Sequence, residues 1–257
     1  MMEDHLKKLV EYAEPRPKNL IVLSGEGSRL KTSFNPPLEY PTSCQFEMSL
    51  LRLETYYSFP NIDSTNNCVR ISIDNGNTWI MIKIPVGCYE IEAMNNEIQR
   101  VIMEKTTEKE KEKQIVFSSN PNTLKCILDI KGAKAQVDFN IENSLNKVVG
   151  FNAKTYTKGR YESEHLVNIM NVNSILVHCD VIGASRVNGR EEPVIYSFFP
   201  DAAPGDKIIS EPKHLIYVPL TMNIISYMTA WLTDQTGKAL DLRGEALTLT
   251  FHVRKIH

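Results

Sequence analysis

The chain has 257 residues, of which 42% are hydrophobic and 23% charged, and its formal net charge is −2. These proportions are ordinary for a globular protein that buries a substantial core. Basic and acidic residues are mixed along the chain, which argues against a general affinity for nucleic acid or for an anionic membrane surface, since both depend on clustered Lys and Arg.

The sequence lacks the marks of a secreted or membrane-spanning chain. Residues 1–8 contain no apolar signal-peptide core, and no window approaches the roughly 18 apolar residues that a membrane helix needs. The five cysteines are odd in number and widely spaced, without a Cys-x-x-Cys pair. We therefore expect the protein to fold in the reducing interior of a cell, without secretion.

Residues 1–18 are interpreted as an N-terminal arm, because Pro15 and Pro17 end the only helical stripe near the start. Short strands are predicted at residues 19–23 and 45–53, with a break at Pro36 and Pro37 between them.

Two alternating runs then flank Asn75-Gly76, at residues 69–73 and 79–84. Asn-Gly between such runs is the strongest short-range signal for a β-hairpin.

One helix is predicted at residues 90–105. Apolar residues spaced by three and four positions form its stripe: Ile91, Met94, Ile98, Val101 and Ile102. The run of mixed charge at residues 104–113 is expected to be a solvated helix end or loop.

The remaining pattern is that of β-strands. Alternating or apolar runs occupy residues 115–117, 124–130, 135–141, 173–181, 194–199, 215–220, 227–233 and 247–253. The last two are joined through Asp234-Gln235-Thr236-Gly237, which has the composition of a tight turn. The prediction is an all-β protein, a sandwich or barrel with one inserted α-helix, in a single domain over residues 19–257.

Reactive side chains do not form a recognisable catalytic or metal motif. In His178-Cys179-Asp180 the cysteine faces away from its neighbours if the segment is a strand, so it is expected to be a buried thiol between two outward polar residues. His165, His178, His214 and His252 are never within four residues of one another. We therefore expect no enzyme activity, no bound metal and no cofactor.

Three short segments are interpreted as turns or loops. The segment from Gly25 to Arg29 lacks the Gly-Lys-Ser/Thr ending of a phosphate loop and is expected to be a hairpin turn. Residues 63–67 lack the alternating acidic ligands of a calcium loop. Arg243-Gly244-Glu245 carries Glu where an integrin-binding tripeptide requires Asp.

A series of segments, taken in order, resembles a known family. They are residues 49–63 (SLLRLETYYSFPNID), 84–92 (IPVGCYEIE), 196–200 (YSFFP) with Pro204-Gly205, 215–219 (LIYVP) and 240–245 (LDLRGE). Together they are similar to the penton, or minor capsid, proteins of Polinton/Maverick elements, adintoviruses and their virophage relatives. The resemblance covers most of residues 19–254.

The resemblance implies a single jelly roll and a structural role in a virion. The expected assembly is a homopentamer at the five-fold vertices of an icosahedral capsid, beside the major capsid protein of the same shell. The alternative is a jelly-roll module that binds a carbohydrate or a receptor.

A ring of identical subunits needs a heterologous interface, in which one flank meets a different flank of its neighbour. Tyr56, Tyr57, Phe59 and Pro60 follow a predicted strand and are candidates for such an interface, because aromatic residues are enriched there. Packing of the same rings inside the barrel is the equally open alternative.

Overall fold

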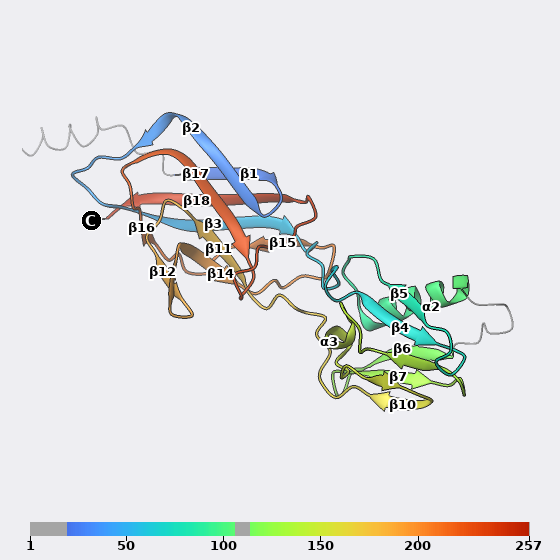
Figure 1. Cartoon of the computed structure of the whole chain (residues 1–257). Helices are drawn as coiled ribbons and strands as arrows, with labels where there is room; N and C mark the ends of the chain where they lie inside the picture. Colours follow the sequence, from blue (N-terminus) through green and yellow to red (C-terminus); the bar gives the residue numbers. More distant parts are fainter. Residues whose placement is uncertain (1–19, 106–113, 257) are drawn as a thin grey trace, which may run out of the picture. The chain divides into compact units, whose positions relative to one another are not determined.

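The structure, a computed structural model, describes residues 20–105 and 114–256 (Figure 1). The predicted arm at residues 1–18 and most of the charged run at 104–113 lie outside the described residues. The chain divides into two compact units, one formed by residues up to Ser58 together with those from Val172 onward, the other by Phe59–Asn171. The single domain over residues 19–257 stays a prediction; the two units depend on which strands pair, which alternation in the sequence does not show.

Unit 1, residues 20–58 and 172–256, consists of two antiparallel sheets and a small hairpin. The first sheet has the order β1 (Leu20–Glu26), β18 (Ala246–Lys255), β3 (Phe46–Tyr56) and β15 (Lys207–Ser210), and β16 (Val218–Pro219) also pairs with β3. The second has the order β14 (Val194–Phe198), β11 (Ile175–Cys179), β17 (Ile224–Thr233) and β2 (Arg29–Glu39). The hairpin pairs β12 (Ser185–Val187) with β13 (Arg190–Glu192).

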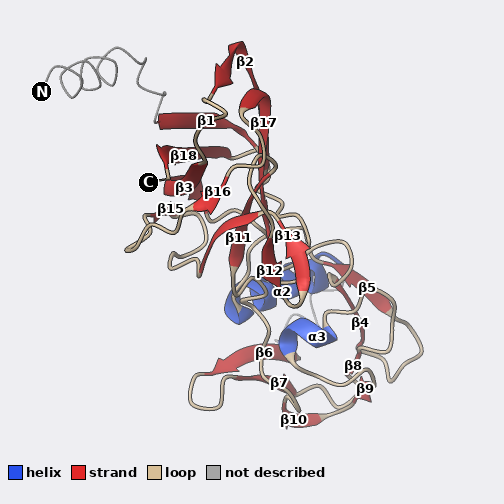
Figure 2. Cartoon of the chain, turned by 90° about the vertical axis from the view of Figure 1, so that its left-hand side faces the viewer, coloured by secondary structure: helices blue, strands red, loops and turns tan. Residues whose placement is uncertain are grey.

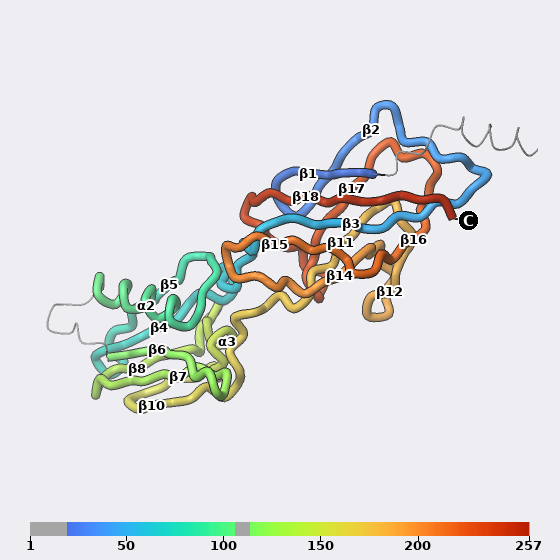
Figure 3. Tube along the Cα trace, turned by 180° about the vertical axis from the view of Figure 1, so that it is seen from behind, coloured from blue at the N-terminus to red at the C-terminus, as the bar shows by residue number. Residues whose placement is uncertain are grey.

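The strand order of unit 1 is that of a jelly roll. We number 1 to 8, in chain order, the four strands named in the order of each sheet: β1, β2, β3, β11, β14, β15, β17 and β18. The strand order is then 1-8-3-6 in the first sheet and 5-4-7-2 in the second. All connections cross from one sheet to the other except that from β11 to β14. This arrangement of two Greek keys closes a β-sandwich, as Figures 1 and 3 show for the labelled strands, and it confirms the all-β prediction.

The closing strand β18 has the alternation that its sequence predicts. Leu247, Leu249, Phe251 and Val253 are fully buried, whereas Thr248, Thr250 and His252 on the other side remain partly accessible. The strand lies between β1 and β3, with Val253 opposite Met48. It therefore occupies the middle of its sheet, where one face is buried against the sandwich core.

The segment from Gly25 to Arg29 is a turn, but not the hairpin turn predicted. Gly27 has a φ of 79°, a conformation that suits glycine. However, β1 pairs with β18 and β2 pairs with β17, so this turn carries the chain from one sheet to the other. The break predicted at Pro36 and Pro37 is also absent, because both prolines lie within β2, which is an edge strand and can tolerate a missing donor.

Unit 2, residues 59–171, is inserted between β3 and β11 and contains both described helices (Figure 2). One sheet has the order β5 (Ile80–Lys83), β4 (Cys68–Ser72), β8 (Gln136–Asp138) and β9 (Thr155–Tyr156). The other has the order β10 (Gly159–Glu162), β7 (Lys125–Ile130) and β6 (Ile115–Asn120). The helices are α2 (Ile91–Lys105) and the four-residue α3 (Asn146–Val149). Only α2 was predicted from the sequence.

Local predictions in unit 2 are confirmed. β4 and β5 form the predicted hairpin, and its turn holds Asn75 and Gly76 at φ values of 67° and 85°. The helix α2 buries four residues of the expected stripe, Ile91, Met94, Ile98 and Val101, whereas the fifth, Ile102, is only partly buried. None of the described helices is long and apolar enough to cross a membrane.

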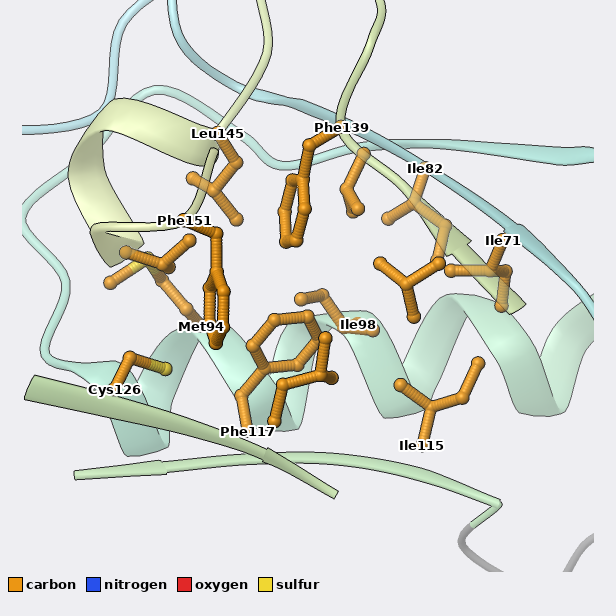
Figure 4. Close-up of a cluster of buried hydrophobic side chains, with 14 of the residues drawn as sticks. Ile71, Ile82, Met94, Ile98, Ile115, Phe117, Cys126, Phe139, Leu145 and Phe151 are labelled. Atoms are coloured by element: carbon orange, nitrogen blue, oxygen red, sulfur yellow. The ribbon is translucent and has the colours of Figure 1, made fainter. Parts of the chain in front are cut away.

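The core of unit 2 is built around aromatic rings (Figure 4). The rings of Phe139 and Phe151 stack with their centroids 5.5 Å apart, and Phe117 and Tyr156 meet Phe139 edge-on. Met94 and Ile98 of α2 point into the same cluster. Unit 2 thus has a hydrophobic core of its own, as expected of a region that folds independently.

Candidate interaction surface

The segment His178-Cys179-Asp180 lies on β11 and the turn that follows it, and it does not assemble a nucleophilic site. Cys179 is fully buried on the core side, and burial raises the pKa of its thiol to about 12, so the thiol stays protonated. Asp180 accepts a hydrogen bond from the backbone N–H of Thr229 at 2.8 Å. His178 points away from Cys179, to the outer side of its sheet as predicted, but its side chain is buried there and only 3% exposed.

Within residues 20–105 and 114–256, no three His, Cys, Asp or Glu side chains are grouped closely enough to hold a metal ion. His252 instead accepts or donates a hydrogen bond at 2.8 Å between its Nδ1 and the hydroxyl of Tyr217. No disulfide joins any of the five cysteines, all of which lie in the described part of the chain. The accessible surfaces of unit 1 include the outer faces of its two sheets.

The four residues predicted from sequence for an interface differ in exposure. Tyr56 ends β3 and is 39% exposed, whereas Tyr57 and Phe59 are 6% and 3% exposed. The backbone of Tyr57 continues the sheet, since its N–H donates to Asp206 and its carbonyl accepts from Gly205. Tyr57 and Phe59 are thus buried within their own chain, as the alternative interpretation expected, while Tyr56 and the half-buried Pro60 remain accessible.

The front face is defined here as the outer side of the β1–β18–β3–β15 sheet. Exposed apolar side chains on this face include Leu20 and Val22 on the edge strand β1, and Tyr56 and Ile209 on the neighbouring strands β3 and β15 at the opposite side. A row of threonines on β18 separates them, with Thr250 opposite both Val22 and Arg52. The face is therefore apolar at its edges and hydroxyl-rich along its middle.

Arg52, Glu54 and Lys207 on the front face are paired with one another. Glu54 receives hydrogen bonds from Lys207 at 3.3 Å and from Arg52 at 2.6 Å, and the bond from Lys207 is the main reason that its pKa is lowered. Since these charges already have partners, they can enter an interface with less unpaired charge than isolated side chains would leave.

The back face is the outer side of the β14–β11–β17–β2 sheet. There the guanidinium of Arg29 lies 5.3 Å from the ring centroid of Trp231, and the ammonium of Lys31 lies 5.6 Å from that of Tyr227. Tyr227 is 58% exposed. Aromatic residues and arginine are the side chains most enriched at the centres of protein interfaces.

Sequence reasoning missed most of both faces. Leu20, Val22, Trp231 and Tyr227 each belong to a predicted strand, but nothing local indicates that these four side chains stay wholly or partly accessible. Elsewhere on the back face, His178 and Thr233 are buried. Strand alternation alone could have placed Trp231 on the side of β17 opposite Leu232, which is buried.

Comparison with known proteins identifies the fold. No protein-family model and no curated protein sequence matches the chain. Among solved structures, the crystal structure of the mavirus penton protein matches it with a TM-score of 0.51 and 8% sequence identity, over 92% of this chain and 99% of the penton chain. Because unit 2 spans Phe59–Asn171, a match of this extent includes both units. The chain thus shares the fold of a viral penton protein.

Proposed function

We propose that this chain is a structural capsid protein of the penton type, without enzymatic activity, whose working form is a ring of five copies at the vertex of an icosahedral shell. The observation that carries the proposal is the jelly-roll strand order of this chain, 1-8-3-6 against 5-4-7-2, together with the fold match to a penton protein over 92% of this chain. A closed sandwich with strands as its main content supplies a stiff building block.

The proposed ring uses the two outer faces of unit 1. In a cyclic ring each subunit contributes two different surfaces, because a single self-complementary patch produces a two-fold dimer instead. The front face offers Tyr56, Ile209, Leu20 and Val22, and the back face offers Trp231 and Tyr227 beneath basic side chains. Front-to-back contact would cover apolar area on one subunit with aromatic and cationic groups on the next.

The segments that resemble Polinton/Maverick, adintovirus and virophage pentons favour a shell of that kind. The expected partners are then the other copies of this chain and the major capsid protein of the same particle, and the expected location is the virion vertex. The proposal includes no specific nucleic-acid ligand.

The test is the mass of the purified full chain across a concentration series. Stable obligate interfaces bury more than about 2,000 Å² in total, so a ring of five should persist into the micromolar range. Sedimentation velocity gives the mass, and negative-stain images of the same fractions give the symmetry. Pentamers with five-fold images support the proposal. A persistent dimer or trimer contradicts it and favours the ligand-binding module.

A further inference from the structure

Unit 2 contains a pocket of about 470 Å³, a volume usual for small-molecule sites, whose wall is dominated by asparagine. Six asparagines line it: Asn61, Asn66, Asn143, Asn146, Asn168 and Asn171. They come from the loop before β4, from the segment around α3, and from the last residues of the unit. Side-chain amides from distant parts of the sequence therefore converge on one space.

Some of these amides make the pocket rigid. Asn61 donates to the carbonyls of Tyr89 and Ile169 at 2.7 and 2.9 Å, and its Oδ1 accepts from the N–H of Tyr89. Asn66 donates to the carbonyl of Asn61 and accepts from the N–H of Asp63. Because these bonds tie the loop before β4 to the rest of unit 2, the wall is already formed without a ligand.

Other polar groups of the pocket are available. The side-chain amides of Asn143 and Asn168 and the ammonium of Lys147 have no hydrogen-bond or ion-pair partner among the described residues, and all three side chains are exposed. Asn143 is held with a φ of 53° by the turn before α3, and its carbonyl accepts from the N–H of Cys68. The backbone of Asn168 is fixed by a bond to Val148.

The composition of the wall selects a class of ligand. Each amide offers a donor and an acceptor, which matches hydroxyl groups, since these also donate and accept. Lys147 is the one charged residue of the lining and provides a partner for a single carboxylate, while Ile141 and Val148 add apolar surface. A phosphate group would favour several cations or a cluster of backbone N–H groups, and a base would favour an aromatic ring to stack on.

We propose that this pocket binds an acidic sugar, of the hexuronate or sialic acid class. The amides of Asn143 and Asn168 hold its hydroxyl groups and Lys147 pairs with its carboxylate. The site lies wholly in unit 2 and does not depend on the oligomeric state of unit 1, so this proposal can fail while the capsid proposal holds, and the reverse.

The experiment is saturation-transfer NMR with the full chain and four probes: N-acetylneuraminic acid, glucuronic acid, glucose and mannose. We expect signals for the two acidic sugars that are much stronger than those for the neutral ones. Lys147→Ala should weaken binding of the acidic sugars about tenfold or more, because it removes a charge-assisted hydrogen bond, and Asn168→Ala should weaken it less.

Two matched variants serve as controls. Lys158→Ala and Asn122→Ala remove the same side-chain types from exposed positions of unit 2 outside the pocket, and both should bind as the unchanged chain does. Thermal melting of every variant shows that the fold is intact. The proposal is overturned if no acidic sugar gives a signal, if neutral sugars bind equally well, or if the pocket variants bind as the controls do.

Discussion

The imidazole of His178 faces the carboxylate of Glu192 without a hydrogen bond to it. Nδ1 of His178 lies 3.9 Å from Oε2 of Glu192 and has no hydrogen-bond partner among the described residues. Nε2 lies 2.9 Å from the hydroxyl of Thr233, which itself donates to the carbonyl of Asp234. Because the hydroxyl hydrogen of Thr233 is used in that bond, its oxygen can only accept from His178. Nε2 of His178 therefore carries the hydrogen, and Nδ1 is the unprotonated nitrogen.

This pair predicts a loss of stability in acid. Burial lowers the pKa of His178, and the charge of Glu192 opposes that shift only in part. Because the folded pKa lies below the unfolded value of about 6.5, the contribution of neutral His178 is complete above that pH and is lost as the pH falls below it. The free energy of unfolding should decline with a slope of at most about 1.4 kcal/mol per pH unit from this group.

Urea unfolding between pH 7.5 and 5 measures this slope. His178→Gln should flatten the profile, whereas His214→Gln, at an exposed position, should leave it unchanged. Glu192→Gln removes the charge that supports the imidazolium, so it should extend the loss to lower pH. Equal slopes for the unchanged chain and His178→Gln would show that this imidazole is not responsible.

The neighbours Tyr56 and Tyr57 should respond to substitution in opposite ways. Tyr56→Ala removes an exposed side chain from the front face, so we expect the pentamer to dissociate more readily. The free energy of unfolding should change by less than about 0.5 kcal/mol. Tyr57→Ala removes a buried ring and should cost about 3 kcal/mol or more. Sedimentation velocity measures assembly and urea unfolding measures stability. If the Tyr56→Ala protein assembles normally, the Tyr56 side chain is not part of the interface.

Removing one aromatic side chain from the core of unit 2 should destabilise unit 2 without destabilising unit 1. Phe139→Ala leaves a cavity beside Phe151 and should cost about 3–5 kcal/mol. The two tryptophans report separately, since Trp79 belongs to unit 2 and Trp231 to unit 1. Fluorescence of single-tryptophan variants should show an earlier transition for Trp79 and an unchanged one for Trp231. A common shift of both would mean that the units unfold together.

The cysteines should divide by burial in their reaction with an alkylating reagent. Cys126 and Cys179 are fully buried, and burial raises the pKa of each thiol to about 12, so both should react slowly in the native protein at pH 8. In denaturant without reductant all five thiols should react. Mass spectrometry counts the adducts, and three or fewer in denaturant would reveal a disulfide.

Elements defined by local pattern could be predicted from the sequence. The turn of the β4–β5 hairpin, the stripe of α2 and the alternation of β18 depend on neighbouring residues alone. The β17–β18 turn is of the same kind, because Asp234 accepts from the N–H groups of Thr236 and Lys238 while Gly237 takes a φ of 86°.

Features that depend on distant pairing could not be predicted. β2 forms despite two prolines because β17 supplies its partner, and His178 is buried because elements far along the chain pack beside it. The division into two units likewise follows from pairing between β3 and β18 across the inserted residues. For the candidate interface, which stays a prediction, the sequence could not say which of the rings at Tyr56, Tyr57 and Phe59 is exposed, because burial depends on distant parts of the chain.

The central position of β18 has a consequence for biosynthesis. Thr55 on β3 and Ala246 on β18 share a hydrogen bond although they are 191 residues apart. At a translation rate of about 5–20 residues per second, β1 and β3 wait roughly 10–40 s for the strand that fits between them. Unit 2 is contiguous and complete by residue 171, so it can fold on the ribosome during that interval. The nascent jelly roll, with unpaired strand edges, is then a natural substrate for chaperones.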